Sequence, residues 1–280
     1  MRIFIISDIH VDYPENRQWV NRISGYDFND DILILAGDVT HQFPIFQKTL
    51  ENLRKKFRRL FFVPGNHDLW INDDRFFDSL EKFQALIEFC QVAGIDINPE
   101  PFEAHGKKIL IVPLFGWYQL KNETGSLYLH KPGEGAIDKL WSDFYYVKWP
   151  RANFKPTEYF LKLNQQKLIK KETADVVITF SHFLPRQETM FSENRKLDRE
   201  RMKKFDRHPP FNFSQVAGST LIEKQLRALG SNIHVYGHQH INRDCRIEGV
   251  RYVAHCLGYP EERRRGTVKD IEQGLKRIWP

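Results

Sequence analysis

The chain opens with MRIFIISDIH at residues 1–10, a short apolar run that ends in an aspartate and a histidine. The apolar residues predict a buried β-strand, and Asp8 and His10 follow directly after it. The same order recurs along the chain, where further apolar runs are followed closely by Asp, Asn or His. Polar groups of this kind at the ends of strands indicate a site at the edge of a sheet.

Strand-like and helix-like patterns alternate over most of the sequence. We expect strands at residues 3–6, 32–36, 60–63, 109–112, 176–180, 233–236, 243–247 and 250–256. We expect helices at residues 15–23, 43–57, 76–93 and 219–229. Alternation of this kind predicts an α/β fold with a mostly parallel sheet. The short glycine-containing connections between the last three strands indicate an antiparallel finish.

Length and composition predict one domain. The 280 residues suit a single large core, with irregular, cap-like insertions near 114–155 and 183–216. The apolar runs are too short to cross a bilayer, so we expect neither a membrane span nor a secretory leader. Three cysteines without a CxxC pair disfavour a disulfide framework and suit a cytoplasmic protein. The net charge of +6 suits an anionic substrate without demonstrating one.

Five motifs carry the candidate chemistry, and each follows a predicted strand. They are Asp8-Ile9-His10, Gly37-Asp38, Gly65-Asn66-His67-Asp68, Ser181-His182 and Gly237-His238-Gln239-His240. Ligands of open α/β sheets bind beyond the carboxyl ends of the strands, so five strands would bring these groups to one crevice. Asp8 and His10 lie two residues apart, as do His238 and His240. In an extended chain, both side chains of such a pair point the same way.

Seven of these residues are candidate metal ligands, and they combine carboxylate, imidazole and amide groups without a thiolate. They are Asp8, His10, Asp38, Asn66, His182, His238 and His240. The set suits manganese, iron, zinc or nickel and disfavours a structural zinc site. Seven ligands are too many for one ion, but with Asp38 as a bridge they suit two ions roughly 3.5–4 Å apart. Such a pair binds phosphate oxygens and makes a bridging water nucleophilic near neutral pH.

Each motif alone has an ordinary structural interpretation. A single Gly-Asp or Ser-His pair carries little information, a histidine after a strand is more often structural, and Gly-Asn is also a common turn pair. Only the complete set, in order and at strand ends, distinguishes a metal centre from coincidence.

The pattern DxH…GD…GNH[DE]…H…GHxH resembles that of the calcineurin-like metallophosphoesterase superfamily and spans residues 8–240. The resemblance implies a four-layer α-β-β-α sandwich, in which two mixed sheets are flanked by helices. It implies one ion bound by Asp8, His10, Asp38 and His240, and another bound by Asp38, Asn66, His182 and His238. His67 would not be a ligand. It would stabilise the transition state or protonate the leaving oxygen, a role that a near-neutral pKa permits.

The second motif departs from two branches of this superfamily. Protein Ser/Thr phosphatases continue it as GDxxDRG, whereas residues 37–42 read GDVTHQ here. Purple acid phosphatases place a metal-binding tyrosine where His41 stands. A histidine at that position resembles the DNA-repair exonucleases of the superfamily, where it pairs with the histidine of the third motif. We therefore expect either that His41 supports His67 in diester cleavage or that it is a solvent-facing residue at a helix start.

The sequence predicts a hydrolase that cleaves phosphoesters through attack of a metal-bridging hydroxide. We expect phosphodiesters or small phosphorylated metabolites as substrates, and manganese as the preferred metal of the two sites. A nuclease acting on DNA or RNA and a catalytically silent scaffold are the competing interpretations. The basic stretch 195–207 and the stretch 261–265 are candidates for contact with substrate, with a solvated surface as the alternative for each. The oligomeric state stays open.

Overall fold

Two β-sheets form the centre of the molecule. The computed structural model describes residues 1–168, 174–191 and 210–280, so the basic stretch 195–207 lies outside the described residues. The first sheet contains, in order, β10 (Lys276–Trp279), β1 (Ile3–Ile6), β2 (Ile32–Leu35) and β3 (Arg59–Phe62). The second contains, in order, β4 (Glu100–Ala104), β5 (Lys107–Pro113), β6 (Val176–Phe180), β7 (Ile233–Tyr236), β9 (Val250–Ala254) and β8 (Arg243–Ile247).

Parallel pairing dominates both sheets. Strands β1, β2 and β3 run parallel, and β10 is added antiparallel at the edge beside β1. Strands β5, β6, β7 and β9 also run parallel, while β4 and β8 are antiparallel edge strands. Because parallel strands end at the same edge of their sheet, the residues that follow them are gathered there.

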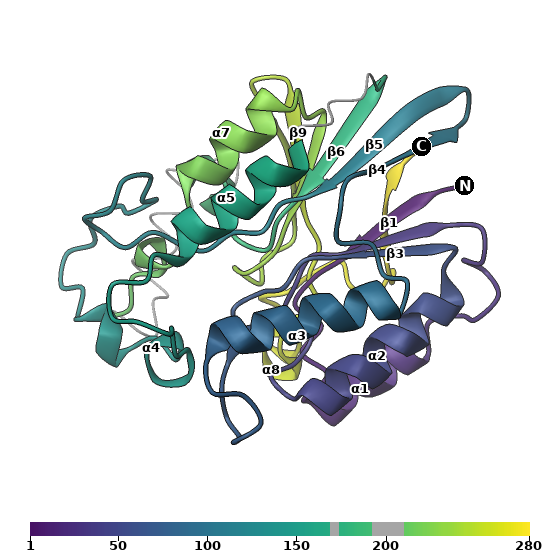
Figure 1. Cartoon of the computed structure of the whole chain (residues 1–280). Helices are drawn as coiled ribbons and strands as arrows, with labels where there is room; N and C mark the ends of the chain where they lie inside the picture. The colour runs from purple at the N-terminus through teal and green to yellow at the C-terminus, as the bar shows by residue number, and fades with distance from the viewer. Residues whose placement is uncertain (169–173, 192–209) are drawn as a thin grey trace.

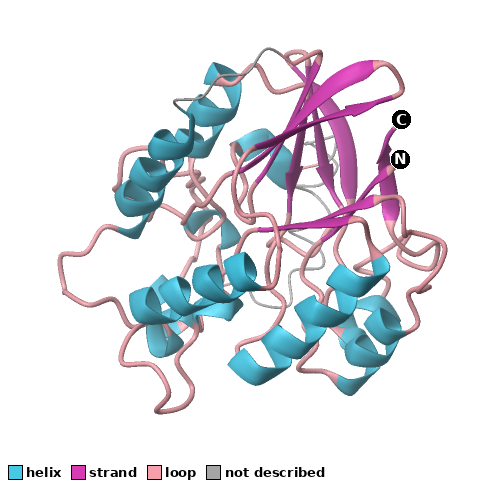
Figure 2. Cartoon of the chain, turned by 45° about the vertical axis from the view of Figure 1, so that its right-hand side comes forward, coloured by secondary structure: helices cyan, strands magenta, loops and turns pink. Residues whose placement is uncertain are grey.

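Helices cover the outer face of each sheet, which gives the expected four layers (Figure 1). The four-stranded sheet is covered by α1 (Pro14–Asn21), α2 (Phe43–Lys56) and α3 (Ser79–Val92). The six-stranded sheet is covered by α5 (Pro156–Leu168) and α7 (Thr220–Ala228). In Figure 2 the strands gather in the upper right part of the molecule, and most of the helices lie to the left of them and below them. None of the described helices is both long and apolar enough to span a membrane.

The apolar strands are explained by this layering, because a strand with a layer on each face has no solvated side. Strands β1, β2, β6 and β7 are buried at every residue, and their sequences are almost continuous apolar runs. The two sheets pack directly on each other, as the edge-on contact of Phe61 in β3 with Phe180 in β6 shows, with ring centroids 6.4 Å apart.

The alternation of strands and helices alone predicted one mostly parallel sheet, whereas the parallel strands are divided between two sheets, as the family resemblance implied. The edge strands β4 and β10 and the helix α5 were not expected from the sequence. Both edge strands carry charged residues among few apolar ones, so their pattern is weak. The antiparallel finish is confirmed for β8 and β9, but β9 lies between β7 and β8 and pairs with β7 in parallel.

Candidate metal centre

The loops after β1, β2 and β7 leave their strands through left-handed backbone conformations. Five of the seven candidate ligands have a positive φ: Asp8 (50°), His10 (36°), Asp38 (55°), His238 (73°) and His240 (54°). The expectation of an extended chain within each i, i+2 pair is therefore wrong, although the side chains of both pairs do reach the crevice. Non-glycine residues adopt this conformation at a cost in free energy. Here the strained residues are the candidate metal ligands themselves.

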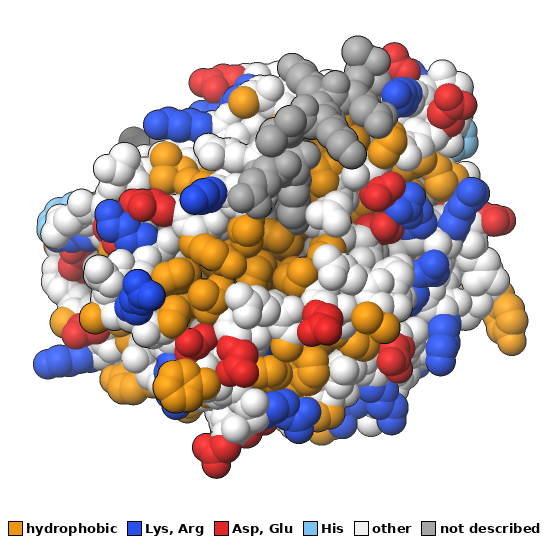
Figure 3. All heavy atoms as spheres, in the orientation of Figure 1, with side chains coloured by type: hydrophobic (Ala, Val, Ile, Leu, Met, Phe, Trp, Pro, Cys, Tyr) orange, Lys and Arg blue, Asp and Glu red, His pale blue; other side chains and the backbone are white. Residues whose placement is uncertain are grey.

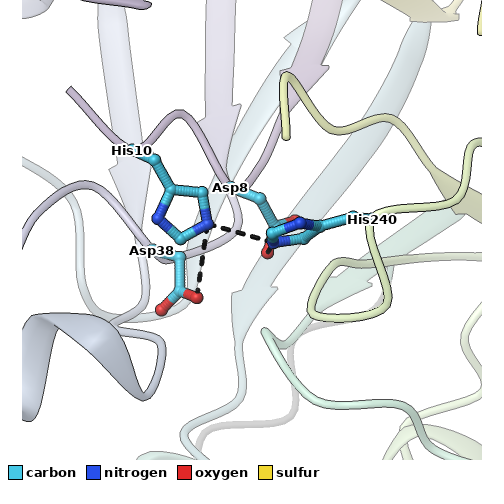
Figure 4. A group of neighbouring side chains, drawn as sticks. All are labelled: Asp8, His10, Asp38 and His240. Carbon is cyan, nitrogen blue, oxygen red and sulfur yellow. Dashed lines mark hydrogen bonds and ion pairs between the residues drawn. The ribbon is translucent and has the colours of Figure 1, made fainter. Parts of the chain in front are cut away.

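Four side chains meet on one side of the crevice (Figure 4). Asp8, His10, Asp38 and His240 offer ligand atoms that all lie within 4.8 Å of one another. Nε2 of His10 lies 3.0 Å from Nε2 of His240 and 3.8 Å from Oδ2 of Asp38. Nε2 of His240 lies 3.3 Å from Oδ1 of Asp8. These nitrogen and oxygen atoms can surround one divalent cation.

A second group shares Asp38 with the first. Ligand atoms of Asp38, His182 and His238 also lie within 4.8 Å of one another. Nε2 of His182 lies 3.5 Å from Oδ2 of Asp38 and 3.2 Å from Oδ1 of Asn66. The amide oxygen of Asn66 therefore completes the second group, and the structure brings all seven candidate ligands into one crevice.

Asp38 stands between the two groups. Its Oδ1 accepts a hydrogen bond of 2.9 Å from the backbone N–H of His67. Its Oδ2 is buried, and none of the described residues supplies a hydrogen bond to it. A buried carboxylate oxygen without a partner is costly unless a cation binds it, and this one faces His10 on one side and His182 on the other. The residues present therefore fit two cations bridged by Asp38.

Three of the candidate histidine ligands form a hydrogen bond through the ring nitrogen that points away from the other ligand atoms. Nδ1 of His182 donates to the backbone oxygen of Ala36 at 2.9 Å, and Nε2 of His238 donates to that of Val216 at 2.9 Å. Nδ1 of His240 donates to Oε2 of Glu262 at 2.7 Å. Such contacts fix the tautomer and leave the other nitrogen free to bind a metal.

Comparison with known proteins agrees with this geometry. Residues 1–242 match the family model described as calcineurin-like phosphoesterase. The chain belongs to the calcineurin-like phosphoesterase family. It is a metal-dependent phosphoric ester hydrolase, and the family has a binuclear centre.

One relative, PptH of Mycobacterium tuberculosis, matches the phosphoesterase both in sequence and in its crystal structure. The chain is similar to the protein described as [acyl-carrier-protein] phosphodiesterase PptH of strain ATCC 25618 / H37Rv, with 26% identity over 293 residues, 94% of this chain and 79% of that protein. It is also similar to the crystal structure of phosphopantetheinyl hydrolase (PptH), with a TM-score of 0.76 and 22% identity over 100% of this chain and 96% of that one. The structural likeness supports the fold.

Two buried carboxylates organise the ligand loops of the phosphoesterase: Asp68, which belongs to the third motif but was given no role from the sequence, and Asp143, which no motif includes. Asp68 accepts hydrogen bonds of 2.8–3.1 Å from the backbone N–H groups of Asp38, Val39, Thr40 and Gly65. Asp143 accepts from Nδ2 of Asn66 at 2.9 Å and also from the indole N–H groups of Trp70 and Trp141. Because Nδ2 of Asn66 is held by Asp143, the amide oxygen must face the crevice. Asp143 belongs to α4 (Asp143–Tyr146), inside the insertion near 114–155.

Glycine is required at two points where the loops of the phosphoesterase approach each other. A Cβ on Gly37, whose φ is +84°, would lie 2.6 Å from Nδ1 of His182. A Cβ on Gly65 would overlap Oδ1 of Asp38. The glycines of the second and third motifs therefore leave room for the ligands themselves.

The charged groups of the centre perturb one another strongly. Burial alone would raise the pKa of Asp8, but His240 and His182 beside it lower this pKa to about 2. Burial alone would lower the pKa of His240, but Asp8 and Glu262 raise it to about 10. A buried carboxylate that attracts a proton to a neighbouring imidazole also attracts a cation, and metal binding would displace that proton.

His67 lies beside the centre and not among the ligand groups. Its ring stacks on Trp70 with centroids 3.7 Å apart, and its Nε2 lies 3.2 Å from the hydroxyl of Tyr259. Burial lowers the pKa of His67 to about 4, although Asp38 opposes the shift. This pKa lies below the near-neutral value expected from the sequence and favours a neutral ring at pH 7, and the role of His67 stays a prediction. A neutral imidazole suits the donation of a hydrogen bond better than the transfer of a proton.

His41 contacts Asp12 and Trp70. Its Nδ1 lies 3.2 Å from Oδ1 of Asp12, and its ring lies 6.3 Å from that of Trp70. Trp70 in turn stacks on His67. Any support that His41 gives to His67 would pass through Trp70, and this support stays a prediction.

The stretch 261–265 reaches the centre through one residue. Glu262 contacts His240 from α8 (Pro260–Arg264), whereas Glu261 forms surface ion pairs with Arg264 and Arg265. The contact is with a candidate ligand side chain, and contact of this stretch with substrate stays a prediction.

Proposed function

We propose that the protein is a binuclear metal-dependent phosphodiesterase. Two divalent cations, when bound, neutralise charge on the phosphoryl group and supply a water that is acidic enough to act as the nucleophile. The buried Oδ2 of Asp38 carries this proposal, because it lacks a hydrogen bond from the described residues and lies between His10 and His182. Asp8, His10, Asp38 and His240 would hold one cation. Asp38, Asn66, His182 and His238 would hold the other.

The ligand set favours manganese at both positions, with iron, zinc or nickel as alternatives. Carboxylate and amide oxygens together with imidazole nitrogens suit these borderline or harder cations, and no thiolate is present to favour a softer one. The outer contacts of Glu262 and Asp143 keep the histidine and asparagine ligands in place before a metal arrives.

The proposed role of His67 is to stabilise the leaving group. Its ring is fixed on Trp70, is neutral at pH 7, and lies 4.7 Å from the ring of His10, a ligand of the first cation. We expect it to donate a hydrogen bond to the oxygen that leaves phosphorus, where negative charge develops. His67→Ala should lower kcat by about a hundredfold. If His41 supports His67, His41→Ala should lower diesterase turnover as well, and an unchanged rate would make His41 a surface residue.

A phosphodiester is the proposed substrate class because of the relative from M. tuberculosis. That protein is described as an acyl-carrier-protein phosphodiesterase, and its similarity extends over 94% of this chain. The linkage between a phosphopantetheinyl group and a carrier protein is therefore the first natural diester to test. The small size of the substrate and the cytoplasmic location of the protein stay predictions.

Nucleic acid is the alternative substrate. Acidic and basic side chains are interspersed over the face shown in Figure 3, and on this face the described residues form no continuous basic band. A nuclease would need such a band to follow a phosphate backbone. Salt-sensitive binding of DNA or RNA to the purified protein would favour this alternative.

A metal-by-substrate screen tests the proposal. The protein is stripped with a chelator, reloaded with manganese, iron(II), zinc or nickel, and offered aryl phosphate diesters, aryl phosphate monoesters, nucleotides, cyclic nucleotides and a phosphopantetheinylated carrier protein. We expect diesters to be cleaved faster than monoesters, with the highest rate in manganese. A fully metallated protein that hydrolyses none of these compounds would contradict the proposal and support a silent scaffold.

A further inference from the structure

Tyr259 lies against the metal centre although no motif includes it. It lies in the loop after β9 and immediately precedes the short helix α8. Its ring centroid lies 4.6 Å from that of His10 and 4.7 Å from that of His240. Its hydroxyl shares a hydrogen bond of 3.2 Å with Nε2 of His67. One side chain thus contacts two candidate ligands of the first cation and the polar edge of His67.

The position of Tyr259 is fixed by the same groups that hold the ligands. Its backbone N–H donates to Oε2 of Glu262 at 2.7 Å, and the same oxygen accepts the Nδ1–H of His240. The preceding residue, Gly258, donates its N–H to the backbone oxygen of Asp8 at 2.9 Å. Tyr259 is therefore tied to both of the loops that supply Asp8 and His240.

The turn before Tyr259 requires glycine. Gly258 has a φ of +63°, and a Cβ at this position would lie 2.7 Å from Cγ2 of Val268 and 3.0 Å from Oε2 of Glu262. Nδ2 of Asn16 adds a hydrogen bond of 2.9 Å to the backbone oxygen of Gly258. These contacts restrict the backbone of Gly258 and Tyr259 and so fix the position of the Tyr259 phenol. A side chain can position another group only if its own position is fixed.

The ring of His67 needs such a partner. Stacking on Trp70 holds the face of the imidazole but gives its ring nitrogens no hydrogen-bond partner. The hydrogen bond with Tyr259 is directional and acts on Nε2 itself. The two contacts together define where the polar edge of His67 points.

We propose that Tyr259 is a positioning residue for His67 in phosphodiester cleavage, through the hydrogen bond between its hydroxyl and Nε2. The proposal rests on the proposed function. Removal of the hydroxyl leaves His67 in place but lets its donor group rotate away from the leaving oxygen. The loss is greatest for substrates whose leaving group is a poor one, because a more basic leaving oxygen depends more on a hydrogen bond.

Tyr259→Phe is the test, because it keeps the ring contacts with His10 and His240 and removes only the hydroxyl. We expect kcat to fall about tenfold for diesters with an alkyl or unsubstituted phenyl leaving group. With a nitrophenyl leaving group the fall should be smaller, and KM should change little for either class. Tyr13→Phe is the matched control, since Tyr13 lies beside Tyr259 at 5.4 Å and is 43% exposed, and its kinetics should equal those of the wild type.

A double-mutant cycle separates positioning from a general structural role. In a His67→Ala background, Tyr259→Phe should cause no further loss of activity, because the group that it positions is gone. Bound metal, measured by elemental analysis, and the thermal unfolding midpoint should be the same in the wild type and in Tyr259→Phe.

Three results would overturn the proposal while leaving the proposed function intact. They are an unchanged kcat in Tyr259→Phe, an equal fractional loss with and without His67, and a loss of bound metal that accounts for the fall in activity. A fully metallated wild-type protein without diesterase activity would refute the proposed function, and this role of Tyr259 with it.

Discussion

Removal of the Glu262 carboxylate should weaken metal binding at the first group of ligands. Oε2 of Glu262 accepts hydrogen bonds of 2.7 Å from Nδ1 of His240 and from the backbone N–H of Tyr259. In Glu262→Ala both donors lose this partner. The imidazole of His240 is then free to rotate or to exchange its tautomer, and Nε2 no longer faces Asp8 reliably.

The size of the effect follows from the contact. Loss of a carboxylate that orients a histidine ligand typically lowers metal affinity or activity by about 10- to 100-fold. That range corresponds to about 1.4–2.7 kcal/mol. The His240 side chain is 9% exposed and that of Glu262 is 29% exposed, so water can replace part of the lost contact. We therefore expect a loss of about tenfold for one of the two cations.

Manganese titration of the metal-free protein measures this prediction. Calorimetry should resolve two binding steps in the wild type, and only one of them should weaken in Glu262→Ala. Glu261→Ala is the matched control, because Glu261 is the adjacent residue of the same helix and pairs with Arg264 and Arg265 at the surface. Equal affinities in the two variants would refute the role given to Glu262. A loss of activity that saturating manganese does not restore would show that its contact with Tyr259 matters more.

Three further predictions concern other parts of the structure. Asp143→Asn should weaken the cation bound through Asn66 and spare the other, which two-step manganese titration would show; equal weakening of both would contradict the assignment. Gly65→Ala should abolish metal binding because its Cβ would overlap Oδ1 of Asp38, whereas Gly25→Ala, with nothing within 4 Å of its Cβ, should bind metal normally. Burial lowers the pKa of His234 to about 3 from its ordinary value of about 6.5, so at intermediate pH the unfolded chain binds a proton that the folded chain does not. Stability from this source is complete above pH 6.5 and is lost as the pH falls, by about 2 kcal/mol at pH 5. Denaturant titrations of the metal-free protein should show a smaller loss between pH 7 and pH 5 in His234→Gln, and parallel losses would contradict this reasoning.

The inner parallel strands were predictable because each of them is marked by the hydrophobicity of its own few residues. Each inner strand is a short apolar run bounded by turn residues, and the boundaries of Ile3–Ile6, Val176–Phe180 and Ile233–Tyr236 agree with the expectation to the residue. The division into two sheets was not predictable from the pattern alone, because a strand buried on both faces looks the same whether its neighbour is a helix layer or a second sheet. Only the resemblance of the motifs indicated the second sheet.

The ligand set was predictable for a related reason. Each motif is short and follows a strand, so strand order brings the motifs together without any long-range information. The groups that orient the ligands have no such signal. Asp143 contacts Asn66 across 77 residues of sequence, and Tyr259 contacts His67 across 192. The position of Asp143 depends on the path of an insertion, and that of Tyr259 depends on the path of the segment after the last motif. The spacing of residues within a motif gives no information on either path.

The outer carboxylates also explain how the fold can hold two cations in a buried crevice. Asp8 and Asp38 are the only carboxylates among the seven candidate ligands, so two divalent cations would bring more positive charge than the ligands neutralise. Asp68, Asp143 and Glu262 each accept a hydrogen bond from a ligand side chain or from the backbone of a ligand loop. In their ionised form, these carboxylates place negative charge one intervening group away from the cations. A buried charge is tolerated only when opposite charge lies near it. Here the ligand carboxylates would contact the cations directly, and the other three carboxylates lie behind the ligands. The five motifs therefore supply the candidate metal ligands, while the segments between and after them supply the groups that orient these ligands.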